Sequence, residues 1–202
     1  MTIRAVFIDF GGVIVRTEDH EPRARQAEKL GMTSRDLEKI VFESESAQRA
    51  STGEILEEAH WQAVADTLGV NRAEADKITA AFFSGDRVDI ILVNYLRSLR
   101  PEHKVCLVSN AWSGLRAFIT RQKFDDIFDD MVISAEVGVT KPDAHIYQLA
   151  LKKLGVQPEE SVFLDDVLVN VEAARTVGMS GIHFTRPEKA LEELKQLLKN
   201  HR

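Results

Sequence analysis

Reactive polar side chains follow four short apolar runs of the sequence. In chain order they are a carboxylate, a hydroxyl beside an amide, a lysine before a proline, and two adjacent carboxylates: Asp9, Ser109 with Asn110, Lys141, and Asp165 with Asp166. Taken one at a time, Ser, Asn and Asp are also the residues that favour the start of a helix. Taken together, they would place a nucleophile, a hydroxyl donor, a cation and a carboxylate pair on one rim of the protein.

The apolar runs predict the elements that hold these side chains. Residues 5–8, 105–108, 131–133 and 162–164 are continuous apolar runs, as expected of strands buried on both faces of a parallel sheet. Asp9 follows the first run, and the two glycines after it would present its carboxylate above the sheet, where α/β proteins bind ligands. Helix-like stretches lie between the runs. We therefore predict an α/β fold with a Rossmann-like parallel sheet flanked by helices.

The strand and helix alternation is interrupted after the first turn. From residue 16 to residue 87 the sequence is charged and helical, and we predict helices over 21–30, 34–48, 54–68 and 72–83, separated at glycines. The alternation resumes at residue 88 with a helix to 99, and it ends with an amphipathic helix over 187–199. The sequence thus predicts a core domain of residues 1–15 and 88–202 and an inserted helical-bundle cap domain of residues 16–87.

The order of the polar motifs resembles the haloacid dehalogenase (HAD) superfamily, whose members mostly transfer phosphoryl groups through an aspartyl-phosphate. The likeness covers nearly the whole chain, and Asp9 matches the nucleophile, Ser109 the phosphate-binding hydroxyl, and Lys141 the motif lysine. The paired aspartates match the metal-binding acidic motif. The first and last motifs look most like those of bacterial glucose-1-phosphate phosphatases and of the N-terminal phosphatase domain of bifunctional epoxide hydrolases.

The resemblance implies a Mg²⁺-dependent mechanism in which Asp9 attacks phosphorus, since a carboxylate is a competent nucleophile toward phosphoryl centres. Mg²⁺ would be held by Asp9, the carbonyl of Gly11 and Asp166, because it prefers oxygen ligands and offsets the repulsion between carboxylate and phosphate. Asp165 is either a further metal ligand or a partner of Lys141.

The same resemblance assigns the contacts with the phosphoryl group. Lys141 would neutralise charge on the transferring oxygens and on Asp9. Ser109 and the backbone N–H of Asn110, near a helix N-terminus, would hold the phosphoryl oxygens. Asn170, one turn into the helix after the acidic pair, would steady that motif.

Substrate recognition is expected from the cap, which in the resembled superfamily is mobile and closes over the site. A polar break between two predicted cap helices matches the specificity loop in position, and its candidate substrate-binding residues are Arg49, Ser51, Thr52 and Glu54. Arg49 would meet an anion and Glu54 a sugar hydroxyl. The alternative is a helix cap flanked by a solvated arginine.

One position departs from the pattern of most phosphatases of the superfamily. They carry an aspartate two residues after the nucleophile as general acid and base, whereas this chain has Gly11. Three consequences remain open: leaving groups that depart unaided, a donor from another residue such as Thr17, or loss of phosphatase function. The resembled glucose-1-phosphate phosphatases share a glycine at this position.

Composition limits the choice of partners. The 202-residue chain carries a net charge of −6 without a basic stretch, which argues against binding of nucleic acid. It has a single cysteine, Cys106, and no apolar run long enough to span a membrane. No signal peptide is recognised. We expect a cytoplasmic protein, a monomer or weak homodimer, that acts on a small-molecule phosphate ester.

Three function classes are open at this level. The first is a Mg²⁺-dependent phosphomonoesterase that hydrolyses a small phosphorylated metabolite, such as a sugar phosphate, and it uses every motif. The second is a metal-independent hydrolase of carbon–halogen bonds, as in 2-haloacid dehalogenases, which has no use for the carboxylate pair. The third is a catalytically weak HAD-like binding protein, suggested by Gly11.

Overall fold

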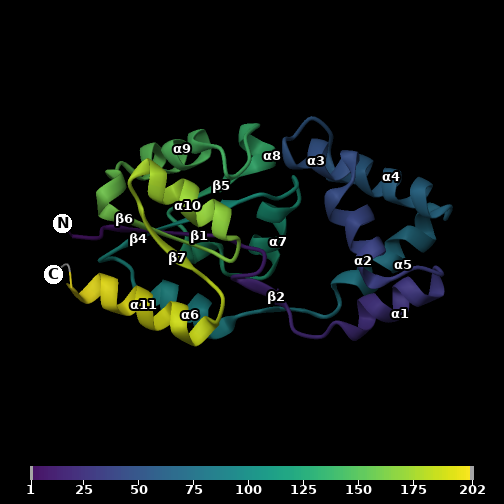
Figure 1. Ribbon diagram of the computed structural model, residues 1–202, viewed down its shortest axis with the longest axis horizontal. Helices are drawn as coiled ribbons and strands as arrows, with labels where there is room; N and C mark the ends of the chain where they lie inside the picture. The colour runs from purple at the N-terminus through teal and green to yellow at the C-terminus, as the bar shows by residue number, and fades with distance from the viewer. Residues whose placement is uncertain (1, 201–202) are drawn as a thin grey trace.

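The computed structural model describes residues 2–200 and divides them between two lobes (Figure 1). The larger lobe contains a five-stranded parallel sheet, and its strand order is β5-β4-β1-β6-β7. The strands are β1 (Ala5–Ile8), β4 (Lys104–Ser109), β5 (Asp130–Ile133), β6 (Ser161–Asp165) and β7 (Ser180–His183). The central strand β1 therefore lies between the two strands that end at Ser109 and at Asp165.

Helices cover both faces of this sheet (Figure 1). One face packs against α9 (Ala144–Leu154) and α10 (Leu168–Val177), and the other against α6 (Ile90–Ser98), α7 (Leu115–Arg121) and α11 (Pro187–Asn200). A short helix, α8 (Ser134–Val137), and two 3₁₀ turns, Asp125–Ile127 and Pro158–Glu160, complete the connections. The predicted α/β fold is confirmed. None of the helices within residues 2–200 is long and apolar enough to cross a membrane.

The first strand shows why its apolar residues are consecutive in the sequence and do not alternate with polar residues. Val6 and Ile8 pack into the hydrophobic cluster of α6, α7 and α11, whereas Ala5 and Phe7 pack into the cluster of α9 and α10. All four side chains are fully buried. A strand covered on both faces has no position for a polar side chain until it leaves the sheet, so Asp9 is the first residue that reaches the rim.

The smaller lobe consists of helices inserted after the first strand. They are α1 (Glu21–Lys29), α2 (Ser34–Glu38), α3 (Glu45–Ser51), α4 (Glu57–Leu68) and α5 (Arg72–Phe83), with a π-helical turn, Lys39–Glu43, between α2 and α3. The predicted single helix over 34–48 is wrong. Ser44 has an extended backbone and accepts a hydrogen bond from the N–H of Ala47, so it ends one helix and begins the next.

Two short strands that the sequence analysis missed connect the lobes. β2 (Val15–Thr17) pairs with the antiparallel β3 (Asp86–Val88), and Arg16 lies opposite Arg87. Three-residue strands separated by the whole insertion carry too short a pattern to be recognised in the sequence. We propose that the boundary between the core domain and the cap domain falls within this ribbon.

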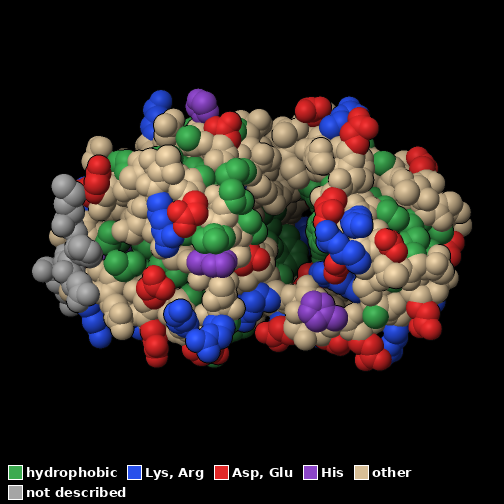
Figure 2. Space-filling model, viewed as in Figure 1, with side chains coloured by type: hydrophobic (Ala, Val, Ile, Leu, Met, Phe, Trp, Pro, Cys, Tyr) green, Lys and Arg blue, Asp and Glu red, His purple; other side chains and the backbone are tan. Residues whose placement is uncertain are grey.

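A cleft separates the lobes on the face shown in Figure 2, and one core side chain crosses into the cap. Trp112, in the loop between β4 and α7, packs against the cap's hydrophobic cluster. Its ring centroid lies 4.5 Å from that of His60 and 5.5 Å from that of Trp61, and its indole N–H donates to the carbonyl of Ala47 at 3.3 Å. The core thus contributes part of the apolar interior of the cap.

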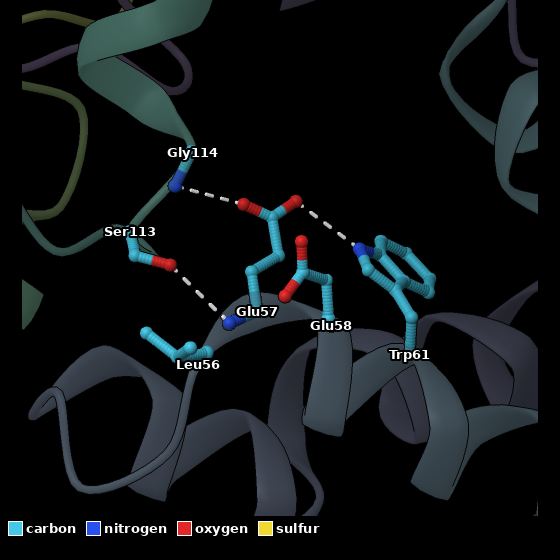
Figure 3. Close-up of a pocket in the computed structure, with 6 residues that line it drawn as sticks. All are labelled: Leu56, Glu57, Glu58, Trp61, Ser113 and Gly114. Atoms are coloured by element: carbon cyan, nitrogen blue, oxygen red, sulfur yellow. Dashed lines mark hydrogen bonds between the residues drawn. The ribbon is translucent and has the colours of Figure 1, made fainter.

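Polar contacts reinforce this junction beside a pocket of about 400 Å³ (Figure 3). The Glu57 carboxylate accepts the backbone N–H of Gly114 at 2.9 Å and the indole N–H of Trp61 at 3.1 Å. The backbone N–H of Glu57 donates to the hydroxyl of Ser113 at 3.3 Å. One cap residue therefore holds two consecutive residues of the core loop.

We predict that Trp112→Ala destabilises the protein, because it empties a partly buried aromatic site at the junction of the lobes. The free energy of unfolding should fall by about 2 kcal/mol, less than the 3–5 kcal/mol typical of fully buried aromatic residues. Urea unfolding measures this change. Ile91→Ala, at a side chain that is 76% exposed, serves as the control and should stay within about 0.5 kcal/mol of the wild type. An unchanged Trp112→Ala variant would contradict the packing role.

Candidate active site

The carboxyl ends of β1, β4 and β6 bring the predicted polar residues to one rim of the sheet. Asp9 is 7% exposed, Ser109 2%, Lys141 4% and Asp165 0%. Charged side chains this deeply buried are rare unless they are paired, because removing an isolated charge from water is strongly unfavourable. The rim is therefore a polar site enclosed by apolar layers.

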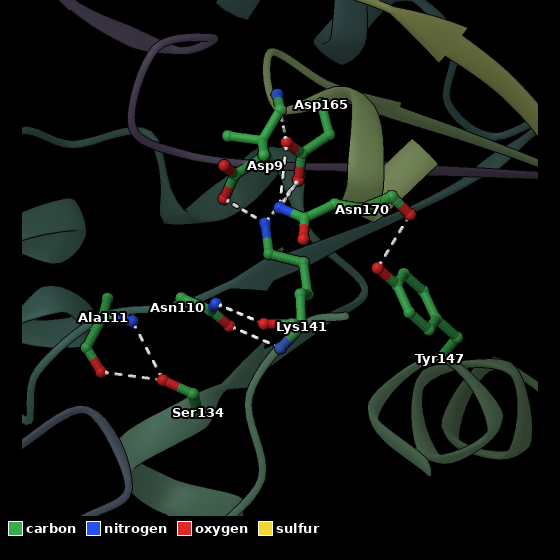
Figure 4. Close-up of polar contacts among 9 residues, drawn as sticks. Asp9, Asn110, Ala111, Ser134, Lys141, Tyr147, Asp165 and Asn170 are labelled. Atoms are coloured by element: carbon green, nitrogen blue, oxygen red, sulfur yellow. Dashed lines mark hydrogen bonds and ion pairs between the residues drawn. The ribbon is translucent and has the colours of Figure 1, made fainter. Parts of the chain in front are cut away.

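Lys141 lies between two of the carboxylates (Figure 4). Its Nζ is 2.8 Å from Oδ1 of Asp9 and donates to Oδ2 of Asp165 at 2.6 Å. The side chain of the lysine is only 1% exposed. Of the two alternatives left open for Asp165, the structure shows the pairing with Lys141.

The remaining contacts of Asp165 come from the start of α10. The side-chain amide of Asn170 donates to both carboxylate oxygens at 3.2 and 3.1 Å, and the backbone N–H of Val167 donates to Oδ1 at 2.7 Å. The hydroxyl of Tyr147 in turn donates to the carbonyl of Asn170 at 2.9 Å. Asn170 thus lies where the sequence analysis placed it, against the acidic motif.

Asn110 has a role that the sequence analysis did not identify. Its side-chain oxygen accepts the backbone N–H of Lys141 at 2.7 Å, and its side-chain nitrogen donates to the carbonyl of Lys141 at 2.9 Å. This two-point contact fixes the backbone from which the lysine reaches the carboxylates (Figure 4). The expected helix N-terminus beside Asn110 is wrong, because α7 begins only at Leu115 after an intervening loop.

Ser134 is a second residue that the sequence analysis missed. It is fully buried at the end of β5, and its hydroxyl accepts the N–H of Ala111 at 3.0 Å and donates to the carbonyl of the same residue at 3.2 Å. It therefore fixes the loop that follows Ser109 and Asn110. A lone serine after a strand gives no sequence signal for such a contact.

The glycine turn after Asp9 has different requirements at its two positions. Gly12 has φ of +77°, and a Cβ there would lie 2.1 Å from Oδ2 of Asp166, so only glycine fits. Gly11 is exposed, and a Cβ there would meet nothing within 4 Å. The turn therefore brings Asp166 close to the strand end while leaving open space beside Gly11.

Three carboxylates converge at this rim in an arrangement that suits a divalent cation. Asp9, Asp165 and Asp166 each offer an oxygen, and these atoms lie within 4.8 Å of one another. Oδ1 of Asp9 is buried and has only its ion pair with Lys141, without a hydrogen bond of good geometry. A single buried ammonium among three carboxylates leaves an excess of negative charge, which hard oxygen-binding cations such as Mg²⁺ neutralise.

The pKa values of two carboxyl groups reflect this excess. Burial raises the pKa of Asp9, although Lys141 opposes the shift, and the Asp165 carboxylate adds to it. Burial also raises the pKa of Asp166 to about 6, with further contributions from Asp9 and Asp165. Both shifts mean that the ionised forms of Asp9 and Asp166 are disfavoured when no cation is bound. A bound cation would stabilise these ionised forms.

The predicted substrate-binding residues of the cap lie beside the core but contact mainly one another. Nε of Arg49 is 3.4 Å from Oε2 of Glu54, and the hydroxyl of Thr52 donates to Oε1 of Glu54 at 3.1 Å. Ser51 is the last residue of α3. The loop approaches α8 closely, since a Cβ at Gly53 would lie 2.1 Å from the carbonyl oxygen of Ala135.

Comparison with known families agrees with this geometry. Residues 3–178 match the model of the haloacid dehalogenase-like hydrolase family. The chain belongs to this family. It is therefore a HAD-like hydrolase, with the parallel sheet and inserted cap that the structure shows.

Individual relatives of this HAD-like hydrolase include named phosphatases. It is 27% identical to a sesquiterpene phosphatase of Aspergillus oryzae over 98% of this chain and 97% of that protein. It is 28% identical to bifunctional epoxide hydrolase 2 of Sus scrofa, of which it spans only 39%, and it spans 7% of acyl-CoA dehydrogenase family member 10 of Mus musculus. The chain thus covers well under half of these two longer relatives.

A solved structure shows the same fold. A HAD family enzyme of Bacteroides thetaiotaomicron, in complex with magnesium and inorganic phosphate, superimposes with a TM-score of 0.75 at 23% identity, covering 89% of this chain and 93% of that one. At this level of identity the likeness establishes the fold.

The raised pKa of Asp166 predicts the pH dependence of stability without metal. Because the folded state holds this proton up to about pH 6 and the unfolded state releases it near 3.8, the ordinary pKa of an aspartate, the free energy of unfolding should fall as the pH rises through this range. With Mg²⁺ present, the free energy of unfolding should instead rise with pH, since the ion takes the place of the proton on the Asp166 carboxylate. Thermal unfolding measures both effects.

Asp166→Asn provides the matched variant for this experiment. It should show a shallower decline of stability with pH and a smaller stabilisation by Mg²⁺, because it lacks the titrating carboxylate. The same pH slope in this variant and in the wild type, both without metal, would contradict the assignment to Asp166.

Proposed function

We propose that this HAD-like hydrolase is a Mg²⁺-dependent phosphomonoesterase that acts on a small phosphate ester through an aspartyl-phosphate at Asp9. The observation that carries the proposal is the carboxylate cluster beside a strand-end aspartate that is ion-paired with Lys141. Relatives named as phosphatases, and a structural neighbour solved with magnesium and inorganic phosphate, support this choice.

In the proposed reaction, a carboxylate oxygen of Asp9 attacks phosphorus in line with the ester oxygen. The new bond joins Asp9 to phosphorus, the bond from phosphorus to the ester oxygen breaks, and water then hydrolyses the acyl phosphate. Lys141 would balance charge on the transferring oxygens, and Ser109, with the Asn110 N–H, would hold them. Asn110 and Asn170 would act by positioning Lys141 and Asp165, as their hydrogen bonds indicate.

The residues present fit a bound Mg²⁺. Asp9, the carbonyl of Gly11 and Asp166 would hold it, whereas Asp165 has its oxygens occupied by Lys141, Asn170 and Val167. When bound, the ion supplies positive charge that offsets the repulsion between Asp9 and the phosphoryl oxygens.

The structure favours this function over hydrolysis of carbon–halogen bonds. Both reactions use the same nucleophile, but only phosphoryl transfer requires a site that concentrates carboxylates for a cation. Asp166 lies exposed against the glycine turn, and a metal-free haloacid reaction has no use for this second carboxylate. The remaining alternative is a catalytically weak binding protein. A direct measurement of phosphatase activity tests it.

The first prediction from this function concerns the nucleophile. Asp9→Asn should lower the turnover of p-nitrophenyl phosphate by about 10⁴-fold, because removal of a covalent nucleophile leaves only binding and electrostatic effects. Steady-state kinetics with Mg²⁺ measures the change. Asp66→Asn, at an exposed aspartate of the cap, is the control and should retain activity. Wild-type turnover by Asp9→Asn would rule out the aspartyl-phosphate.

The second prediction concerns the missing general acid at Gly11. A positioned acid contributes about 10²- to 10⁴-fold to a proton-transfer step, so the wild type should hydrolyse aryl phosphates far better than simple alkyl phosphates. Gly11→Asp should narrow this gap, since Gly11 lies outside the left-handed region and open space surrounds its missing Cβ. The measurement is the ratio of kcat/KM for ethyl phosphate to that for p-nitrophenyl phosphate. A wild type indifferent to the leaving group, with chemistry rate-limiting, would show that another residue already donates the proton.

A further inference from the structure

Two cap arginines that could meet a charged substrate are engaged within the cap. Arg49 is paired with Glu54, and Arg23 is buried and bonded to Asp86 and Glu38. These two arginines therefore interact with cap carboxylates. Phe42, by contrast, is a large apolar side chain that remains 45% exposed.

Phe42 belongs to a packed group of rings that we call the aromatic wall, formed by Phe42, Phe82, Phe83 and Trp112. Phe42 stacks on Trp112 with ring centroids 6.0 Å apart and planes inclined by 25°. It also contacts Phe82 at 5.5 Å and Phe83 at 6.1 Å. Because three rings contact Phe42, packing restricts its side chain and holds its exposed apolar face in place.

The backbone of the cap is irregular where it presents this ring. Phe42 lies in the π-helical turn Lys39–Glu43 between α2 and α3. Such turns are rare and occur frequently at functional sites, since they re-aim a side chain that a regular helix would direct elsewhere. The packed rings account for the buried part of Phe42, and its 45% exposed part is the surface that a ligand could contact.

A short connection places the aromatic wall next to the phosphate site. Trp112 is three residues after Ser109, and the residues between them are fixed, Asn110 by Lys141 and Ala111 by Ser134. The ring of Trp112 is itself held by its hydrogen bond to the cap. Figure 2 shows hydrophobic side chains within the cleft between the lobes.

Exposed apolar side chains also come directly after the acidic pair. Val167, Leu168 and Val169 directly follow Asp166, and these side chains are 45%, 49% and 56% exposed. Three consecutive exposed apolar residues beside a charged cluster are unusual at a site for a polyhydroxylated substrate, which would require hydrogen-bonding side chains.

We propose that the substrate is the phosphate monoester of an uncharged aromatic alcohol, whose ring stacks on Phe42 of the aromatic wall. The proposal rests on the phosphomonoesterase function and names its substrate class. Phe42 and Trp112 set the specificity, whereas the polar loop from Arg49 to Glu54 shapes the cap. Stacking of the substrate ring would explain why the cap exposes an aromatic face. An uncharged alcohol would need no cap cation, in agreement with the pairing of Arg23 and Arg49 within the cap.

The test compares two esters of primary alcohols of similar acidity, benzyl phosphate and glycerol 1-phosphate, so that leaving-group chemistry is matched and only recognition differs. The wild type should show a kcat/KM at least tenfold higher for benzyl phosphate. Phe42→Ala should lower that value about tenfold, mainly through KM, and change glycerol 1-phosphate less than about twofold. Phe42→Leu should give an intermediate loss, and Leu56→Ala, at another exposed cap side chain, should change neither.

Calorimetry with benzylphosphonate, which cannot be hydrolysed, separates recognition from chemistry. In the presence of Mg²⁺, Phe42→Ala should weaken its binding about tenfold and leave the binding of ethylphosphonate unchanged. Equal affinity of the wild type for the two phosphonates, or an equal loss in the variant, would overturn the aromatic specificity. Tight binding of benzylphosphonate without turnover of any ester would instead contradict the phosphomonoesterase function and leave the aromatic specificity standing.

Discussion

The structure depends on one buried interaction, the contact of the Lys141 ammonium with the carboxylates of Asp9 and Asp165. Two carboxylates at the ends of neighbouring strands repel each other, and burial of each ion costs several kcal/mol unless a cation and hydrogen bonds compensate it. The strand order β4-β1-β6 brings the carboxylates together, and the segment after β5 supplies the cation. Because three carboxylates converge around this one ammonium, negative charge remains in excess, and a metal ion would neutralise it.

A single loop links this chemistry to the cap. Between β4 and α7, successive residues hold the lysine backbone, bind the end of β5 and pack into the cap: Asn110, Ala111 and Trp112. Glu57 then holds the next two residues from the cap side. Because few residues separate these contacts, a change in the position of the cap acts on the loop that directly follows Ser109. In the proposed function, this loop would therefore connect substrate recognition by the cap with the phosphate site.

The sequence predicts the parts of this arrangement that depend on local patterns. Continuous apolar runs identified β1, β4, β5 and β6 but not the edge strand β7. The polar residues after these runs identified the rim, because parallel strands align their carboxyl ends. The roles of the Asn110 side chain and of Ser134 were missed, since each bonds a backbone that is distant in sequence. The ribbon and the π-helical turn were also missed, because segments of three to five residues carry too short a pattern to be recognised. The exposure of Phe42 follows from that same turn, so no sequence pattern pointed to it.

The stability of Lys141→Met as a function of pH tests most directly whether the buried ammonium holds the site together. Without it, Asp9 and Asp165 must ionise in a buried site with no cation, so the variant should lose about 3–5 kcal/mol of unfolding free energy near neutral pH. The deficit relative to the wild type, measured by urea unfolding without metal, should shrink toward about pH 5, because burial raises the pKa of Asp9 and the folded variant then keeps a proton on this carboxyl group. A second substitution, Asp165→Asn, should recover part of the loss. A deficit that is the same at both pH values, and that Asp165→Asn does not reduce, would contradict the role of Lys141.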